Sequence, residues 1–133
     1  MKALCEKLSP LVPLILRIGL GVTFVYHGFS KTFGEGASFG TSWNPGEMAA
    51  IVQALVAWGE LLCGLAILGG FMVPLAALGI VIIMTGAIIM VHGKNGFNMM
   101  NHGFEYNFVL IMMSIALMGT GAGPCSIESK CCK

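Results

Sequence analysis

The chain alternates between four long apolar stretches and shorter segments rich in turn-forming residues. The apolar stretches cover about residues 11–29, 48–69, 74–92 and 104–118. A hydrocarbon core of ~30 Å requires about 20 mainly apolar residues per helix. Since backbone amides in lipid must be satisfied internally, each stretch is expected to be helical. The pattern therefore predicts four transmembrane helices, and the last is the shortest, which leaves its tilt open.

The connections between these stretches are short, so consecutive helices are expected to be antiparallel neighbours in an up-down four-helix bundle. The expected helices also carry glycines, which let membrane helices approach closely. They are Gly19, Gly21, Gly59, Gly64, Gly79, Gly86 and Gly93. We therefore expect one all-α membrane domain over residues 1–133 with a short cysteine-containing tail. Some of its glycine-bearing surface is expected to pack against other membrane subunits or a second copy of the chain.

Composition supports a membrane environment. Apolar residues make up 56% of the chain and charged residues only 10%, whereas soluble domains contain about 45–50% and about 25%. The net charge of +1 excludes a basic nucleic-acid binder, so the expected partner is the lipid bilayer.

Lysines indicate the orientation in that bilayer, because cytoplasmic flanks carry the excess of Lys and Arg. The side that holds both termini carries Lys2, Lys7, Lys130 and Lys133, whereas the other side carries Lys31 and Lys94. This distribution predicts a multi-pass protein of the cytoplasmic membrane with both termini in the cytoplasm.

Two ionisable residues, Arg17 and Glu60, fall inside the apolar stretches. Such residues are costly in lipid unless they are paired or face water, which makes them candidates for function. At 1.5 Å per residue, Arg17 lies ~9 Å from the cytoplasmic face. The same count leaves Glu60 ~12 Å from that face. The similar depths predict an intramembrane Arg17–Glu60 ion pair, whose role as a structural pair or as a proton or ligand site is left open.

A second group of polar residues gathers at the opposite membrane face. His27 lies at the end of the first stretch with Lys31 one turn further on, His92 ends the third, and Glu105 and Tyr106 begin the fourth. Together they are candidates for a ligand-binding or proton-exchanging pocket. The alternative is that these side chains only anchor helices at the head-group level. The three histidines also raise a metal site, but no two have the i, i+4 spacing, so no metal ligand is assigned.

The five cysteines do not form a recognisable metal or disulfide pattern. Cys63 lies within the second stretch, where a small packing residue is expected. Cys125 and the Cys131-Cys132 pair do not have the CxxC spacing of zinc or iron–sulfur sites. The role of Cys125, Cys131 and Cys132 is left open.

Several ordered motifs resemble the DoxX family of small membrane proteins over residues 11–128. The first motif is Leu16-Arg17 with Gly19, Gly21, Phe24, His27-Gly28 and Lys31. Further along, the motifs are Glu60 with Gly64 and Gly69, His92 with Asn95-Gly96-Phe97, then Gly103-Phe104-Glu105-Tyr106. The last is Gly121-Ala122-Gly123-Pro124-Cys125-Ser126-Ile127-Glu128, and the cysteine-bearing tail after it departs from the family pattern.

The resemblance implies a four-helix protein of the cytoplasmic membrane. Relatives include a thiosulfate:quinone oxidoreductase subunit, components of complexes that handle oxidative and thiol stress, and proteins that assist assembly of other membrane proteins. The first function expected is therefore a subunit of a redox-linked complex, with a quinone as the possible cofactor or a sulfur compound as substrate. The alternative is a non-catalytic accessory or assembly subunit. A transporter is disfavoured because paired broken helices are absent from the sequence pattern.

Overall fold

The computed structural model describes residues 6–44, 46 and 48–131. Throughout these residues the chain is helical or irregular, without a strand. The long helices are α2 (Val12–Phe33), α3 (Ala50–Gly69), α4 (Val73–Ala87) and α5 (Glu105–Thr120). The short elements are η1 (Ser9–Leu11), η2 (Ser38–Gly40), η3 (Ile88–His92), η4 (Gly93–Asn95), η5 (Met99–Asn101) and α6 (Ile127–Cys131).

Three helical segments of the described residues have the length and composition of membrane spans, and α5 is a shorter apolar helix. The continuous helical segments Glu6–Phe33, Ala50–Gly69 and Val73–Asn95 are long and apolar enough to cross a membrane. Helix α5 has 16 residues, or ~24 Å at 1.5 Å per residue. The predicted all-α membrane fold is confirmed, with one useful difference: α2 continues past residue 29 to Phe33, so Lys31 lies on a helix rather than in a loop.

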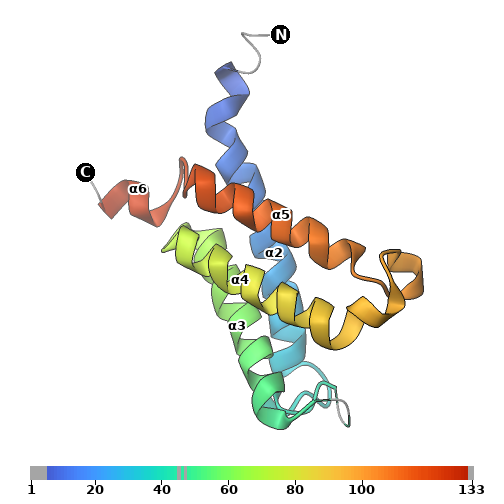
Figure 1. Ribbon diagram of the computed structural model, residues 1–133. Helices are drawn as coiled ribbons and strands as arrows, with labels where there is room; N and C mark the ends of the chain where they lie inside the picture. Colours follow the sequence, from blue (N-terminus) through green and yellow to red (C-terminus); the bar gives the residue numbers. More distant parts are fainter. Residues whose placement is uncertain (1–5, 45, 47, 132–133) are drawn as a thin grey trace.

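The helices form two antiparallel pairs. Figure 1 shows α2 and α3 running side by side, while α4 and α5 form a second pair that crosses the first at an angle. Buried apolar side chains from all four helices fill the region between the pairs, including Leu20, Phe24, Ile67, Ile80 and Leu117. The two hairpins are therefore packed tightly around this core, and the site described below lies beyond it.

Glycines set the distance between α2 and α3. A Cβ on Gly64 would lie 2.7 Å from the Val25 backbone nitrogen, and one on Gly28 would overlap the Leu61 backbone. Close helix contact, which the sequence led us to expect at the glycines of the third span, is found at Gly79 but not at Gly86. A Cβ on Gly79 would lie 2.8 Å from the Cys63 sulfur, whereas one on Gly86 would meet nothing within 4 Å. Thus α4 is in close contact with α3 at Gly79 but leaves open space beside Gly86.

Arg17 joins three segments at the end of the bundle where α3 ends. Its Nε donates to the Ile67 carbonyl at 2.9 Å and its Nη2 donates to the Leu68 carbonyl at 2.8 Å. Its Nη1 donates to the carbonyls of Ala122 and Pro124 at 3.0 and 3.2 Å. The last carbonyls of a helix lack internal partners and carry the negative end of its dipole, so a guanidinium is favourable there. Only 2% of Arg17 is exposed, yet every buried polar side-chain atom in the described residues has a partner.

The predicted Arg17–Glu60 pair is wrong. Gly28 lies opposite Leu61, so Glu60 is level with the Gly28 region of α2. Arg17 is eleven residues earlier on the same helix, which is ~16 Å along its axis. Counting depth from the ends of the apolar stretches assumed that both helices begin flush with the membrane faces. Instead α2 is shifted along α3, and Arg17 meets the carboxyl end of α3.

A buried amide organises the loop between α2 and α3. Gln53 on α3 donates through Nε2 to the Met48 carbonyl and accepts through Oε1 from the Asn44 backbone N–H. Its own backbone carbonyl accepts from the Trp43 indole at 2.9 Å. These hydrogen bonds place Trp43 against the end of α2 that carries Lys31.

Candidate functional site

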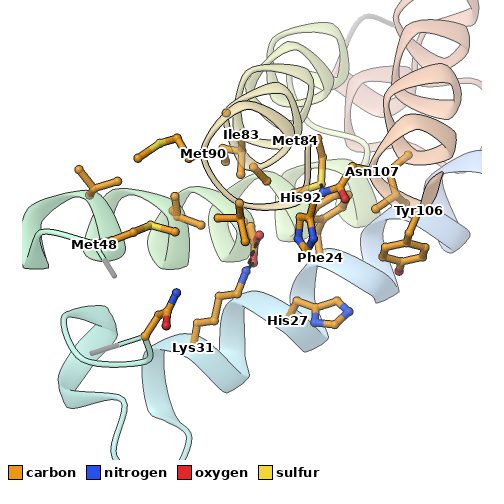
Figure 2. A pocket seen from close by; sticks show the side chains of 18 of the residues that line it. Phe24, His27, Lys31, Met48, Ile83, Met84, Met90, His92, Tyr106 and Asn107 are labelled. Atoms are coloured by element: carbon orange, nitrogen blue, oxygen red, sulfur yellow. Dashed lines mark hydrogen bonds and ion pairs between the residues drawn. The ribbon is translucent and has the colours of Figure 1, made fainter. Parts of the chain in front are cut away.

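A cavity of about 680 Å³ separates the two hairpins at the end of the bundle opposite Arg17. Its walls come from α2, α3, α4, the η3 turn, α5 and the loops beside them. Figure 2 shows Lys31 and His92 pointing into this space, with His27 and Tyr106 on one flank and Met48 and Met90 on the other. The volume is within the ~300–1,000 Å³ typical of small-molecule sites.

An ion pair lies at the base of the cavity. The Lys31 ammonium on α2 is 2.7 Å from both carboxylate oxygens of Glu60 on α3. Glu60 is almost completely buried, while the Lys31 side chain keeps 24% of its surface exposed. Lys31 also lies over the Trp43 ring, 4.7 Å from its centroid, a cation–π contact that further positions the ammonium.

His92 is positioned by the geometry of the helix that carries it. Helix α4 ends in a π-helical turn, Ile88–His92, a local widening that often occurs at functional sites. His92 Nδ1 lies 2.9 Å from the His102 carbonyl oxygen. Because a carbonyl only accepts, this nitrogen carries a hydrogen, and in a neutral ring Nε2 is then free to accept a hydrogen bond.

His27 and Tyr106 line the cavity from α2 and α5. His27 is exposed, and its ring packs edge-on against Tyr26 with centroids 5.4 Å apart. Tyr106 is 41% exposed. These side chains are therefore the ones through which the cavity meets the surroundings between α2 and α5.

Glu105 belongs to a different arrangement from the other predicted residues. Its Oε2 accepts a hydrogen bond from the Met99 backbone N–H at 3.1 Å, and it does not line the cavity. The carboxylate thereby holds the η5 turn against the start of α5. The structure thus brings His27, Lys31, His92 and Tyr106 to one cavity. The Glu105 carboxylate instead binds the η5 turn beside it.

Sequence reasoning missed four contributors to the site. Trp43, Gly86, His102 and Asn107 all line the cavity. Asn107 is buried and its Nδ2 lies 3.4 Å from the Met84 sulfur. A polar amide within an apolar stretch was the available signal for Asn107. Trp43 and His102 lie in loops, whose course no periodic pattern predicts.

The arrangement offers an ammonium, two imidazoles and a phenol around a largely apolar space. Such groups donate hydrogen bonds to carbonyl or hydroxyl oxygens, and imidazole also exchanges protons near neutral pH. Among the described residues, no three His, Cys, Asp or Glu side chains converge as a metal-binding group. Fold and cavity together define a small multi-pass helical membrane protein with an apolar cavity that has an ion pair at its base.

Comparison with known proteins identifies the family to which this chain belongs. The model of the DoxX family matches residues 12–93, from the first residue of α2 to the first residue of η4. The chain belongs to the DoxX family. The matched range contains His27, Lys31, Glu60 and His92, so these cavity residues all lie within the segment that the family model matches.

A protein of Bacillus subtilis (strain 168), named "Putative oxidoreductase CatD", is 34% identical over 110 residues. The alignment covers 80% of this chain and 78% of that protein. No solved structure matches the chain. The family and this relative support a redox-associated membrane protein.

Proposed function

We propose that this chain is the quinone-binding membrane subunit of a redox-linked complex in the cytoplasmic membrane. One observation carries the proposal: the Lys31–Glu60 pair lies at the base of an apolar cavity that also contains His92, His27 and Tyr106. A quinone head group has two carbonyl oxygens that accept hydrogen bonds on an otherwise apolar ring. The cavity offers donors and apolar walls in the same combination.

The ion pair favours a neutral quinone over a small sulfur oxyanion. Glu60 already neutralises Lys31 at 2.7 Å, so the pair contributes no net charge to the cavity. An oxyanion would have to displace a buried carboxylate, which then loses its partner at high cost. A quinone carbonyl requires only a hydrogen-bond donor, and the ammonium has three N–H groups to share.

Within this proposal the residues have separate roles. Lys31 donates to a quinone oxygen, His92 Nε2 accepts from a hydroxyl of the reduced quinol, and Glu60 holds the Lys31 ammonium in position. His27 and Tyr106 lie at the exposed flank, where they exchange protons with the surroundings. Glu105 positions the η5 turn rather than the ligand.

The test is quinone binding to the full chain in lipid nanodiscs, measured by calorimetry with short-chain ubiquinone and menaquinone analogues. Lys31→Ala is expected to weaken quinone binding about tenfold, the equivalent of one lost charged hydrogen bond. His92→Ala is expected to weaken binding of the reduced quinol forms about fivefold, through loss of one neutral hydrogen bond. Lys94→Ala is the matched control, because Lys94 is exposed near His92 but does not line the cavity. Unchanged affinity in well-inserted Lys31→Ala and His92→Ala proteins contradicts the proposal.

A second measurement separates this function from that of a non-catalytic accessory subunit. Complexes are purified from native membranes in mild detergent, and their proteins and quinones are identified by mass spectrometry. A quinone lost from the complex when Lys31 is replaced supports the redox role. A stoichiometric membrane enzyme that retains its quinone and activity with the Lys31 variant supports the accessory role instead.

A further inference from the structure

We propose that the cavity opens sideways into the lipid between α3 and α4, and that the hydrocarbon tail of a lipid-soluble ligand occupies this opening. Gly86 keeps the opening free. The inference rests on the proposed function for the identity of the head group, but the opening itself is argued from exposed cavity walls and from the spacing of α3 and α4.

The wall residues on this side are exposed apolar side chains. Leu55 on α3 is 67% exposed and Ile82 on α4 is 64% exposed, yet both line the cavity. Met90 in the η3 turn is 58% exposed and lines it as well. A side chain that belongs to the cavity wall and to the outer surface at once marks a place where the cavity reaches that surface.

Position along the helices places this opening within the spanning segments. Leu55 is fourteen residues before the end of α3 and Gly86 is thirteen residues after the start of α4. Measured along each helix, both are therefore ~20 Å from the short turn that joins α3 to α4, which is within the length of a ~30 Å hydrocarbon core. At these levels the surroundings are acyl chains rather than water, so an apolar chain enters without leaving its solvent.

The contact between α3 and α4 ends just before Gly86. A Cβ on Gly79 would lie 2.8 Å from the Cys63 sulfur, and one on Gly59 would lie 2.9 Å from Ile83 Cδ1. At Gly86 the same construction meets no atom within 4 Å. The two helices are therefore closed together as far as Ile83, and the missing side chain at Gly86 leaves the gap beyond it unfilled.

Polarity changes from the opening to the base of the cavity. The opening is lined by Leu55, Ile82, Gly86 and Met90, whereas Lys31, Glu60 and His92 lie further inside. Figure 2 shows Met90 and Lys31 at well-separated places in the cavity. This order matches a ligand with a polar head and an apolar tail that enters head first from the membrane. The head group then lies at the polar base, and the tail stays among the apolar residues of the opening.

The experiment compares two quinones on three proteins in nanodiscs. The probes are a tail-less dimethoxy-methyl-benzoquinone and the same head group with a ten-carbon tail. Gly86→Leu is expected to weaken binding of the tailed probe by about tenfold or more, because the leucine side chain occupies the opening and overpacks it when the tail is bound. Binding of the tail-less probe is expected to change less than about twofold in the same protein, since it makes no tail contact. Gly119→Leu is the matched control, because Gly119 is likewise a helical glycine whose added Cβ would meet no atom within 4 Å, but it does not line the cavity.

A probe without a quinone tests the opening separately. A fatty acid with a diazirine at its terminal carbon is photo-cross-linked to the protein in nanodiscs, and the products are mapped by mass spectrometry. Labelling is expected in segments 52–56 and 82–90 of the wild type and the Gly119→Leu protein, and is expected to fall in the Gly86→Leu protein. If this pattern holds but neither quinone binds the wild type, the proposed function fails and the lipid-facing opening stands. If both quinones bind and Gly86→Leu leaves both affinities unchanged, the opening is refuted and the proposed function stands.

Discussion

The Lys31 ammonium reaches both oxygens of the Glu60 carboxylate at 2.7 Å, although the two residues lie on different helices. Lys31 is two residues from the end of α2, whereas Glu60 is in the middle of α3. The long lysine stem therefore extends inward along the apolar cavity, and the charge lies closer to the membrane centre than its Cα does. The free-energy cost of burying this ion pair is low only while both partners are present.

Removing either partner is expected to have unequal effects. Lys31→Met leaves a nearly fully buried carboxylate without a cation and is expected to cost roughly 3 kcal/mol of stability. Glu60→Gln is expected to cost less, because the Lys31 side chain is 24% exposed and can turn toward water. The double variant Lys31→Met with Glu60→Met is expected to be more stable than Lys31→Met alone. Denaturant titration in detergent micelles measures all three, and equal stability of the Lys31→Met and double variants contradicts the pair's importance.

Arg17 is expected to be irreplaceable by lysine. Its guanidinium donates to carbonyls of two separate segments through three nitrogens, and an ammonium does not reproduce that planar fork. Arg17→Lys is expected to lose roughly 2–4 kcal/mol through lost charged hydrogen bonds to buried carbonyls. Amide hydrogen exchange over residues 122–126 is expected to accelerate in this variant while exchange in α5 changes less. Wild-type protection of that loop in Arg17→Lys would show that the guanidinium is dispensable.

The glycines at the α2–α3 contact are expected to tolerate no side chain. Gly28→Ala places a methyl group into the Leu61 backbone and Gly64→Ala places one 2.7 Å from the Val25 nitrogen, so each is expected to lower the melting temperature. Gly119→Ala is the control, since it meets no atom within 4 Å. Alanine is the better helix former by about 1 kcal/mol, so this variant is expected to be as stable as the wild type or slightly more so. Melting is followed by circular dichroism in detergent.

Orientation in the membrane gives a prediction that does not depend on the ligand. The lysine distribution favours both termini in the cytoplasm. Green fluorescent protein fused after Lys133 is expected to fluoresce in intact cells, and alkaline phosphatase fused at the same position is expected to be inactive. Active phosphatase with a dark fluorescent-protein fusion reverses the proposed orientation without affecting the fold.

The helices could be predicted from the sequence because membrane spans are long and nearly uniform in composition. The length of helix needed to cross the membrane is also fixed by the thickness of the bilayer. Packing did not follow as fully. Gly79 makes the close contact expected of a small residue, while Gly86 on the same helix faces open space. Two glycines at a regular spacing therefore have different surroundings, because α3 and α4 are in contact at Gly79 and separated at Gly86.

The sequence predicted which membrane face carries the site residues, but it did not predict which of them contact one another. Helix counting placed His27, Lys31, His92, Glu105 and Tyr106 at one face, and the structure brings four of them to one cavity. Glu105 differs from Tyr106 beside it because adjacent residues on a helix point about 100° apart, and its side chain turns toward the Met99 N–H. The ion pair was assigned to the wrong cation because depth alone gives no information on register, which here depends on the contact of Gly28 with Leu61.

The two ends of the bundle are joined differently. Around Arg17 the hairpins are joined by hydrogen bonds to α3 and to the loop after α5, whereas at the far end the cavity separates them. If one hairpin rocked against the other, the pivot would therefore lie near the joined end and the displacement would grow toward the cavity. For the ligand proposed above, this arrangement predicts exchange through small-angle motion of preformed helices, without melting a span.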